Sequence, residues 1–163
     1  MSDGAVVVLG LGNIIMSDEG VGVHVIRRLL DDPRLPAGAR LVDGGTLGLE
    51  LLSVASGADV LIVVDAVDLD LAPGSVVRLG AAELFEMDRG ASAHQLGVAD
   101  LLSALRMLGA EPANVVLLGV QPKQVGLGTE LSAEIEAALD PLVDQVLAEI
   151  RGTATNAEGV CHA

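Results

Sequence analysis

The chain of 163 residues carries 23 acidic against 9 basic side chains, for a formal net charge of −14. Such a charge repels polyphosphate backbones, so we expect no binding to nucleic acid. Hydrophobic residues make up 51% of the chain and aromatic residues only 1%, so the core must be packed from aliphatic side chains. The length predicts one domain over residues 1–150, followed by a disordered tail over residues 151–163.

The sequence also bears on compartment and membrane association. No stretch approaches the ~18 apolar residues that span a bilayer, and the start of the chain does not resemble a signal peptide. The single cysteine, Cys161, cannot form an internal disulfide bond. We therefore expect a cytoplasmic protein that does not associate with membranes.

The chain is organised around its first strand and the helix that follows. The apolar run 5–9 predicts a strand buried on both faces, and Gly10 and Gly12 allow a sharp turn after it. Apolar residues recur at helical spacing over residues 18–30, so a helix is predicted there. Its first turn carries two adjacent carboxylates, Asp18 and Glu19, beside the end of the strand.

This stretch has two other interpretations besides a metal-binding or catalytic role: a purely structural role for the acidic residues, and a nucleotide-binding site. Acidic residues at a helix N-terminus interact favourably with the helix dipole, by about 0.3–1 kcal/mol each. The glycines also resemble part of a dinucleotide-binding motif, but that motif needs a third glycine where this chain has Ile15. The two carboxylates would, moreover, repel a pyrophosphate.

The rest of the chain alternates between strands and helices. Further strands are predicted at 39–42, 59–68, 75–79 and 114–120. Further helices are predicted at 47–57, 97–108 and 132–150, with a long connector over 81–93. Pro141 predicts a kink or local break in the last helix.

This alternation is typical of an α/β fold: a three-layer αβα sandwich with a mostly parallel sheet and one antiparallel edge strand, residues 75–79. In such folds, ligands bind outside the carboxyl ends of the strands, where the strand order reverses. Glu19, Asp43, Asp65 and His94 all follow a strand or precede a helix on that edge. We therefore expect them to converge.

Two carboxylates and an imidazole form an incomplete coordination set that suits a divalent metal ion such as nickel, zinc, iron or manganese. Asp65 has an equally simple alternative as a loop-capping acid, and His94 as a helix cap or a packed core residue. The chain has no nucleophile elbow, zinc-binding helix, phosphate-binding loop or paired-cysteine site. Cys161, next to His162, is given no role.

Five short motifs resemble, in order and spacing, those of the maturation proteases that process the large subunit of [NiFe] hydrogenases. Their residues are Gly10-Leu11-Gly12-Asn13 with Asp18-Glu19-Gly20, Asp43-Gly44-Gly45-Thr46, Asp65-Ala66, His94-Gln95-Leu96-Gly97 and Gly119-Val120-Gln121-Pro122. Each motif is weak alone, but the ordered set is specific. The resemblance covers residues 5 to about 150.

The resemblance implies an endopeptidase that removes a C-terminal extension from the hydrogenase large-subunit precursor after nickel insertion. The metal-binding positions of the family fall on Glu19, Asp65 and His94, and the metal is expected to be nickel (or a surrogate divalent ion) carried by the substrate. Asp43 falls on an acid proposed to act in cleavage, as in an aspartyl-type endopeptidase. We expect the protein to be a monomer, with no cofactor of its own.

Two alternatives of other classes remain open at this point. The first is a nickel-binding assembly chaperone that keeps the three ligands but does not cleave. The second is a nucleotide-binding protein of the Rossmann type, which would be stabilised against heat by dinucleotides and not by nickel.

Overall fold

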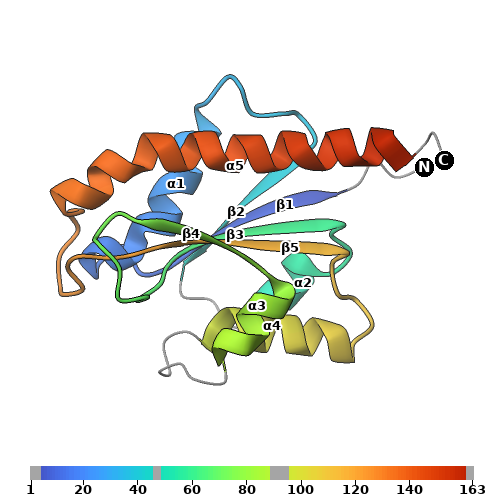
Figure 1. Cartoon of the computed structure of the whole chain (residues 1–163), viewed down its shortest axis with the longest axis horizontal. Coiled ribbons are helices and arrows are strands. Elements are labelled where there is room, and N and C mark those ends of the chain that lie inside the picture. The colour runs from blue at the N-terminus through green and yellow to red at the C-terminus, as the bar shows by residue number, and fades with distance from the viewer. Residues whose placement is uncertain (1–4, 46–48, 89–95, 161–163) are drawn as a thin grey trace.

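A single five-stranded sheet forms the centre of the molecule, with the strand order β2-β1-β3-β5-β4. The computed structural model describes residues 5–45, 49–88 and 96–160. The strands are β1 (Val6–Leu11), β2 (Ala39–Gly45), β3 (Val60–Ala66), β4 (Val76–Gly80) and β5 (Asn114–Val120). All neighbouring strands pair in parallel except β4, which pairs antiparallel with β5 at the sheet edge (Figure 1). The predicted αβα sandwich with one antiparallel edge strand is confirmed.

Helices cover both faces of this sheet (Figure 1). Short 3-10 helices, η1 (Ser17–Gly20) and η2 (Leu49–Leu51), directly precede α1 (Val21–Leu30) and α2 (Leu52–Ala55). The remaining helices are α3 (Ala81–Asp88), α4 (Leu96–Met107) and α5 (Ala133–Val160). Helices α1 and α5 lie on one face, and α2, α3 and α4 lie on the other. None of the helices in the described ranges is long and apolar enough to cross a membrane.

Two separate hydrophobic clusters hold these three layers together. Alternate residues of a strand point to opposite faces, so Ile62 packs toward α1 and α5 while Leu61 and Val63 pack toward α2 and α4. These side chains are fully buried. Truncating one of them to alanine would remove about 2–5 kcal/mol of stability.

The predicted helix over residues 18–30 is divided in the structure. Ser17 has a positive φ of 54°, and residues Ser17–Gly20 form the 3-10 helix η1 before α1 begins at Val21. Hydrogen bonds to a distant loop hold this first segment, as described below, and they override the continuous helical spacing of the sequence.

The sequence predicts a connector over residues 81–93, but 81–88 form helix α3. The carboxylate of Glu83 accepts a hydrogen bond from the amide of Gly80 at the start of this helix. Leu84 is buried, and the guanidinium of Arg106 stacks on the Phe85 ring at 4.7 Å. The helix has only 8 residues, about two turns, which is too short for its apolar positions to establish a helical period in the sequence.

Helix α5 continues through Pro141 without a break and extends to Val160. Residues 151–160 are therefore helical where the sequence predicts a disordered tail, and residues 161–163, with Cys161, lie outside the described residues. Adding residues to an existing helix costs much less than starting one, so α5 can continue past the buried Ile150.

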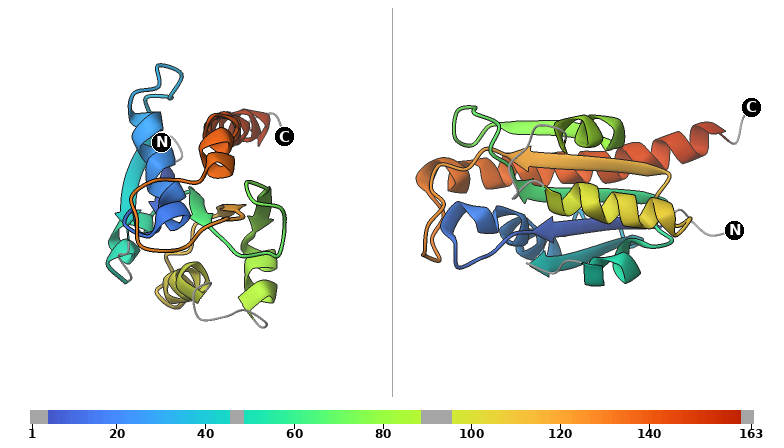
Figure 2. Two further views of the ribbon diagram at one scale, coloured as in Figure 1. Left: turned by 90° about the vertical axis from the view of Figure 1, so that its left-hand side faces the viewer. Right: turned by 90° about the horizontal axis from the view of Figure 1, so that it is seen from below.

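The strand order reverses between β1 and β3. Helix α1 connects β1 to β2 on one face, whereas α2 connects β2 to β3 on the opposite face and passes over β1. The chain leaves β1 toward β2 and leaves β3 toward β5, in opposite directions along the sheet, so the switch point lies at the carboxyl ends of β1 and β3. In the left view of Figure 2 this edge of the sheet faces the viewer.

Candidate functional site

Two of the predicted acidic residues lie together at this switch point. Glu19 belongs to η1, which follows β1 and contacts β3, and Asp65 is the second-to-last residue of β3. Both side chains are half-buried. The structure thus brings Glu19 and Asp65 to the same edge of the sheet, at the switch point, as the strand-end rule predicts.

Glycines explain why η1 and α1 lie so close to the strand ends. A Cβ atom on Gly22 would lie 2.2 Å from the carbonyl oxygen of Val64, and one on Gly10 would lie 2.3 Å from the carbonyl oxygen of Gly22. Gly12 has a φ of 115°, and a Cβ there would lie 1.8 Å from the carbonyl oxygen of Glu19. The glycines therefore serve backbone packing, which places Glu19 against β3.

The environment of Asp65 favours its neutral form. Burial raises the pKa of the Asp65 carboxyl to about 7, and the nearby Glu19 carboxylate adds to the increase, while the amide of Ala66 opposes it. A cation placed between the two carboxylates would reverse this preference, because it would stabilise both negative charges. Raised pKa values of this kind are typical of functional sites, although structural acids show them as well.

Asp43 lies on the other side of β1. Gly10 pairs with Asp43 of β2 on one side and with Val64 of β3 on the other, so two strand spacings, about 10 Å, separate Asp43 from Asp65. Asp43 is exposed, and its carboxylate accepts a hydrogen bond of 3.1 Å from the amide of Gly45. Asp43 therefore shares the edge but is not adjacent to the Glu19–Asp65 pair.

The fourth predicted residue, His94, lies outside the described residues. Helix α4 leads into the parallel strand β5, so its first residue, Leu96, lies at the carboxyl edge of the sheet. Within the described ranges, no three His, Cys, Asp or Glu side chains come together as a metal site. The three-ligand set of Glu19, Asp65 and His94 therefore stays a prediction.

Asp18 has a role that the sequence did not indicate. Its carboxylate is fully buried and accepts hydrogen bonds from the amides of Lys123, Gln124 and Ser132 and from the Ser132 hydroxyl, at 2.7–3.0 Å. Burial alone would raise the pKa of Asp18, but these hydrogen bonds outweigh it and lower the pKa below its usual value. Asp18 thus holds the loop between β5 and α5, and the helix dipole does not explain its position.

Gln121 holds a second loop at the same edge. Its buried side-chain oxygen accepts hydrogen bonds from the amides of Leu69 and Leu71, and its side-chain nitrogen donates to Asp68 and to the carbonyl of Pro122. The loop that follows Asp65 is thereby tied to the end of β5. The sequence shows only a glutamine directly after a buried strand. That pattern does not indicate which loop Gln121 would hold.

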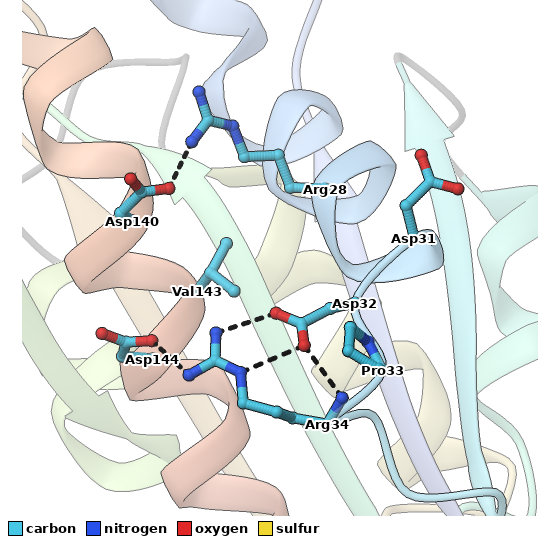
Figure 3. A pocket seen from close by; sticks show the side chains of 8 residues that line it. All are labelled: Arg28, Asp31, Asp32, Pro33, Arg34, Asp140, Val143 and Asp144. Carbon is cyan, nitrogen blue, oxygen red and sulfur yellow. Dashed lines mark hydrogen bonds and ion pairs between the residues drawn. The ribbon is translucent and has the colours of Figure 1, made fainter.

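A surface cavity between α1 and α5 is a different feature (Figure 3). It is lined by ion-paired residues: Arg28 pairs with Glu136 and Asp140, and Arg34 pairs with Asp32 and Asp144. It lies at the C-terminal end of α1, whereas Glu19 precedes its N-terminal end, so the cavity belongs to the opposite edge of the sheet. The pairs of Arg28 join α5 to α1, and the pair of Arg34 with Asp144 joins α5 to the loop between α1 and β2.

The fold and the edge together define an α/β protein with an acidic site at the switch point of its sheet. A sequence model of the hydrogenase maturation protease family matches residues 23–149. Hydrogenase 2 maturation protease from Escherichia coli strain K12 is 39% identical over 154 residues, covering 93% of this chain and 94% of that protein.

Solved structures agree with the sequence match. The hydrogenase maturating endopeptidase HybD from Escherichia coli superposes with a TM-score of 0.84 and 39% identity, covering 91% of this chain and 93% of that one. The [NiFe] hydrogenase maturation protease HybD from Thermococcus kodakarensis gives a TM-score of 0.74 at 31% identity, covering 86% of this chain and 95% of that one. The chain belongs to the hydrogenase maturation protease family and is an endopeptidase.

Proposed function

We propose that this endopeptidase removes the C-terminal extension from the precursor of a [NiFe] hydrogenase large subunit after nickel has been inserted. The observation that carries the proposal is the Glu19–Asp65 pair at the switch point of a chain that belongs to this protease family. The similarity to a structure named as a [NiFe] hydrogenase maturation protease supports the choice of substrate.

Glu19, Asp65 and His94 would bind the nickel ion that the substrate carries. Carboxylate and imidazole groups suit a divalent first-row metal ion, and three protein ligands leave positions for ligands from the substrate. A positive ion would also relieve the repulsion between Glu19 and Asp65, which is one cause of the raised pKa of Asp65. Binding to nickel would then select precursors that are already loaded.

Asp43 is proposed as the general base. Hydrolysis of a peptide bond requires a base that takes a proton from the attacking water while the leaving amine gains one. Asp43 is exposed at the carboxyl edge, on the far side of β1 from Asp65. A bond held over the end of β1 would therefore have Asp43 on one side and the nickel ligands on the other.

The direct test is cleavage of one precursor prepared with and without nickel, with both products identified by mass. We expect release of the C-terminal peptide from the nickel-loaded form alone, because nickel positions the scissile bond. Equal cleavage of the nickel-free precursor would contradict the proposal. Nickel-dependent binding without any peptide release would instead point to an assembly chaperone.

Substitutions separate the proposed ligands from ordinary surface acids. Glu19→Gln, Asp65→Asn and His94→Ala should each abolish cleavage while the protein remains folded. Asp31→Asn is the matched control, because Asp31 is exposed at the C-terminal end of α1, away from the proposed site. Wild-type rates in all three ligand variants would refute the assignment. Sedimentation of the wild type should show a monomer.

A further inference from the structure

Three large apolar side chains are exposed at the same edge of the sheet as Glu19. Ile15 is 50% exposed, Val125 is 56% exposed and Leu127 is 86% exposed. They come from two segments more than a hundred residues apart in the chain, and we refer to the three together as the apolar rim. Isolated exposed apolar residues are ordinary, whereas a group beside a proposed site suggests an interaction surface.

A parallel β-bridge brings these two segments together. Met16 pairs with Gly128, the amide of Ser17 donates to the carbonyl of Gly128, and the amide of Gly128 donates to the carbonyl of Ile15, both at 2.8 Å. In a parallel pair the residues that precede the bridge are also neighbours, so Ile15 lies beside Leu127. Ile15 and Leu127 are thus neighbours, and Val125 precedes Leu127 in the same loop.

Further hydrogen bonds fix the rim in place. The Ser17 hydroxyl donates to the carbonyl of Gly126, and the amide of Asp18 donates to the carbonyl of Gln124. The buried Asp18 carboxylate holds the amides on either side of the rim segment, at Lys123, Gln124 and Ser132. A rigid surface loses little conformational entropy on binding, so its exposed apolar area is available for affinity.

The location of the rim indicates what covers it. Ile15 and Glu19 belong to one short segment between β1 and α1, so the rim lies beside the proposed site at the same edge of the sheet. A protein whose peptide bond reaches Glu19 and Asp65 must pass over the loops at this edge of the sheet. A second copy of this chain is a poor occupant, because two molecules of net charge −14 repel each other.

We propose that the apolar rim is the docking surface for an apolar segment of the substrate protein near its scissile bond. This inference rests on the proposed function and adds a substrate-recognition element that is independent of nickel. The rim would align the precursor before its metal reaches Glu19, so its loss should raise KM and leave kcat unchanged.

The test compares Leu127→Ser with Met107→Ser in cleavage of the nickel-loaded precursor. Met107 is 89% exposed at the C-terminal end of α4, so it matches Leu127 in exposure but lies at the opposite edge of the sheet. We expect Leu127→Ser to raise KM by about tenfold, because it removes one large apolar contact. Met107→Ser should have the kinetic constants of the wild type. Equal KM values for Leu127→Ser and the wild type would overturn the proposal.

Two further measurements distinguish failure of the docking proposal for the apolar rim from failure of the proposed function. Binding to the nickel-free precursor reports on the rim without chemistry, and Leu127→Ser should weaken it by a similar factor. If the rim variant weakens binding while the wild type cleaves no precursor, the rim is supported and the proposed function fails. If sedimentation shows a wild-type dimer that Leu127→Ser dissociates, a second copy covers the rim and the proposal is wrong.

Discussion

At the scale of single residues, Asp18 shows how a side chain beside the site acts through structure. Its two oxygens receive three amides and one hydroxyl from the loop between β5 and α5. The carboxylate is fully buried. If it were removed, no water could reach these donors to accept their hydrogen bonds. The contribution of Asp18 to the free energy of unfolding is therefore the penalty that those buried donors would incur without an acceptor.

Asp18→Ala should accordingly lower the free energy of unfolding by about 3 kcal/mol, since several buried donors lose their acceptor. Asp18→Asn keeps one acceptor oxygen and should lose less. Urea denaturation measures both values, and Asp31→Ala serves as the exposed control with a change within about 0.5 kcal/mol. A loss below about 1 kcal/mol in Asp18→Ala would mean that the loop finds other partners.

Asp65 predicts a pH dependence of the metal-free protein. Its pKa is about 7 when folded and about 3.9 in an unfolded chain, so the folded state binds more protons between these values. Stability therefore falls as the pH rises from about 4 to 7. Asp65→Asn should remove this fall and be more stable than the wild type at pH 8 by about 2 kcal/mol, a figure reduced for the partial exposure of the carboxyl.

Thermal unfolding with a chelator present, at pH 5 and pH 8, measures this effect. The difference between the two proteins should be smaller at pH 5 than at pH 8, because the fall begins near pH 4 and only its first part has occurred by pH 5. An Asp65→Asn protein that is less stable than the wild type at pH 8 would show that the charged carboxylate is stabilised by contacts of its own. The same variant is expected to lose cleavage. Asp65 would then reduce the stability of the protein while being required for its activity.

At the scale of elements, the contact between α1 and the strand ends depends on the absence of side chains. Gly22 lies where a Cβ would meet the backbone of Val64 and Leu11 at 2.2–2.8 Å, and backbone cannot move aside as a flexible side chain can. The position of Glu19 on η1 depends on this contact, because η1 leads directly into α1.

Gly22→Ala should therefore cost about 3 kcal/mol of stability and reduce cleavage, although Gly22 bears no reactive group. Gly97→Ala is the matched control within a helix, because a Cβ on Gly97 meets nothing within 4 Å. That change should be neutral or stabilise the protein by up to about 1 kcal/mol. Denaturation midpoints and cleavage rates of both variants measure the difference, and a tolerated Gly22→Ala would argue against the close contact.

Elements with a strong pattern can be predicted from the sequence, and elements made by tertiary contacts cannot. Strand β5 is predicted over its observed range, 114–120, because its apolar run is continuous and buried on both faces. Helix α3 has only 8 residues, too few to establish a helical period, and its N-terminus depends on a hydrogen bond from the amide of Gly80 to the Glu83 carboxylate. The division of the predicted helix at Val21 depends on bonds to residues 124–128, which no local window contains.

The candidate site divides in the same way. The strand-end rule places Glu19 and Asp65 at one edge, since parallel strands end together. Strand order, which puts β1 between Asp43 and Asp65, cannot be read from the chain. Apart from the neighbouring Pro122, the partners of Asp18 and Gln121 lie 50–114 residues away, and residue type alone does not specify such pairs.

At the scale of the whole molecule, α5 covers one face of the sheet, and its buried side chains there include Ile150. A chain ending at Gly152 should keep the stability of the full chain within about 0.5 kcal/mol and cleave the precursor at the same rate. A chain ending at Ala148 loses the buried Ile150 and the ion pair of Glu149 with Arg78, and should be less stable by about 2–5 kcal/mol. Urea denaturation of both chains, with cleavage assays, tests the boundary. Loss of cleavage in the chain ending at Gly152 would give the terminal residues a function.

The bridge between Met16 and Gly128 has a consequence for how the enzyme comes into being. Residues 15–18 leave the ribosome early, but their partners at 123–132 are made only after the fifth strand. Closing a loop of this length is slow compared with forming a local helix or turn, so we expect the active edge to be completed among the last events of folding. A chain still under synthesis would lack that edge, and proteolytic activity would begin only with the finished molecule.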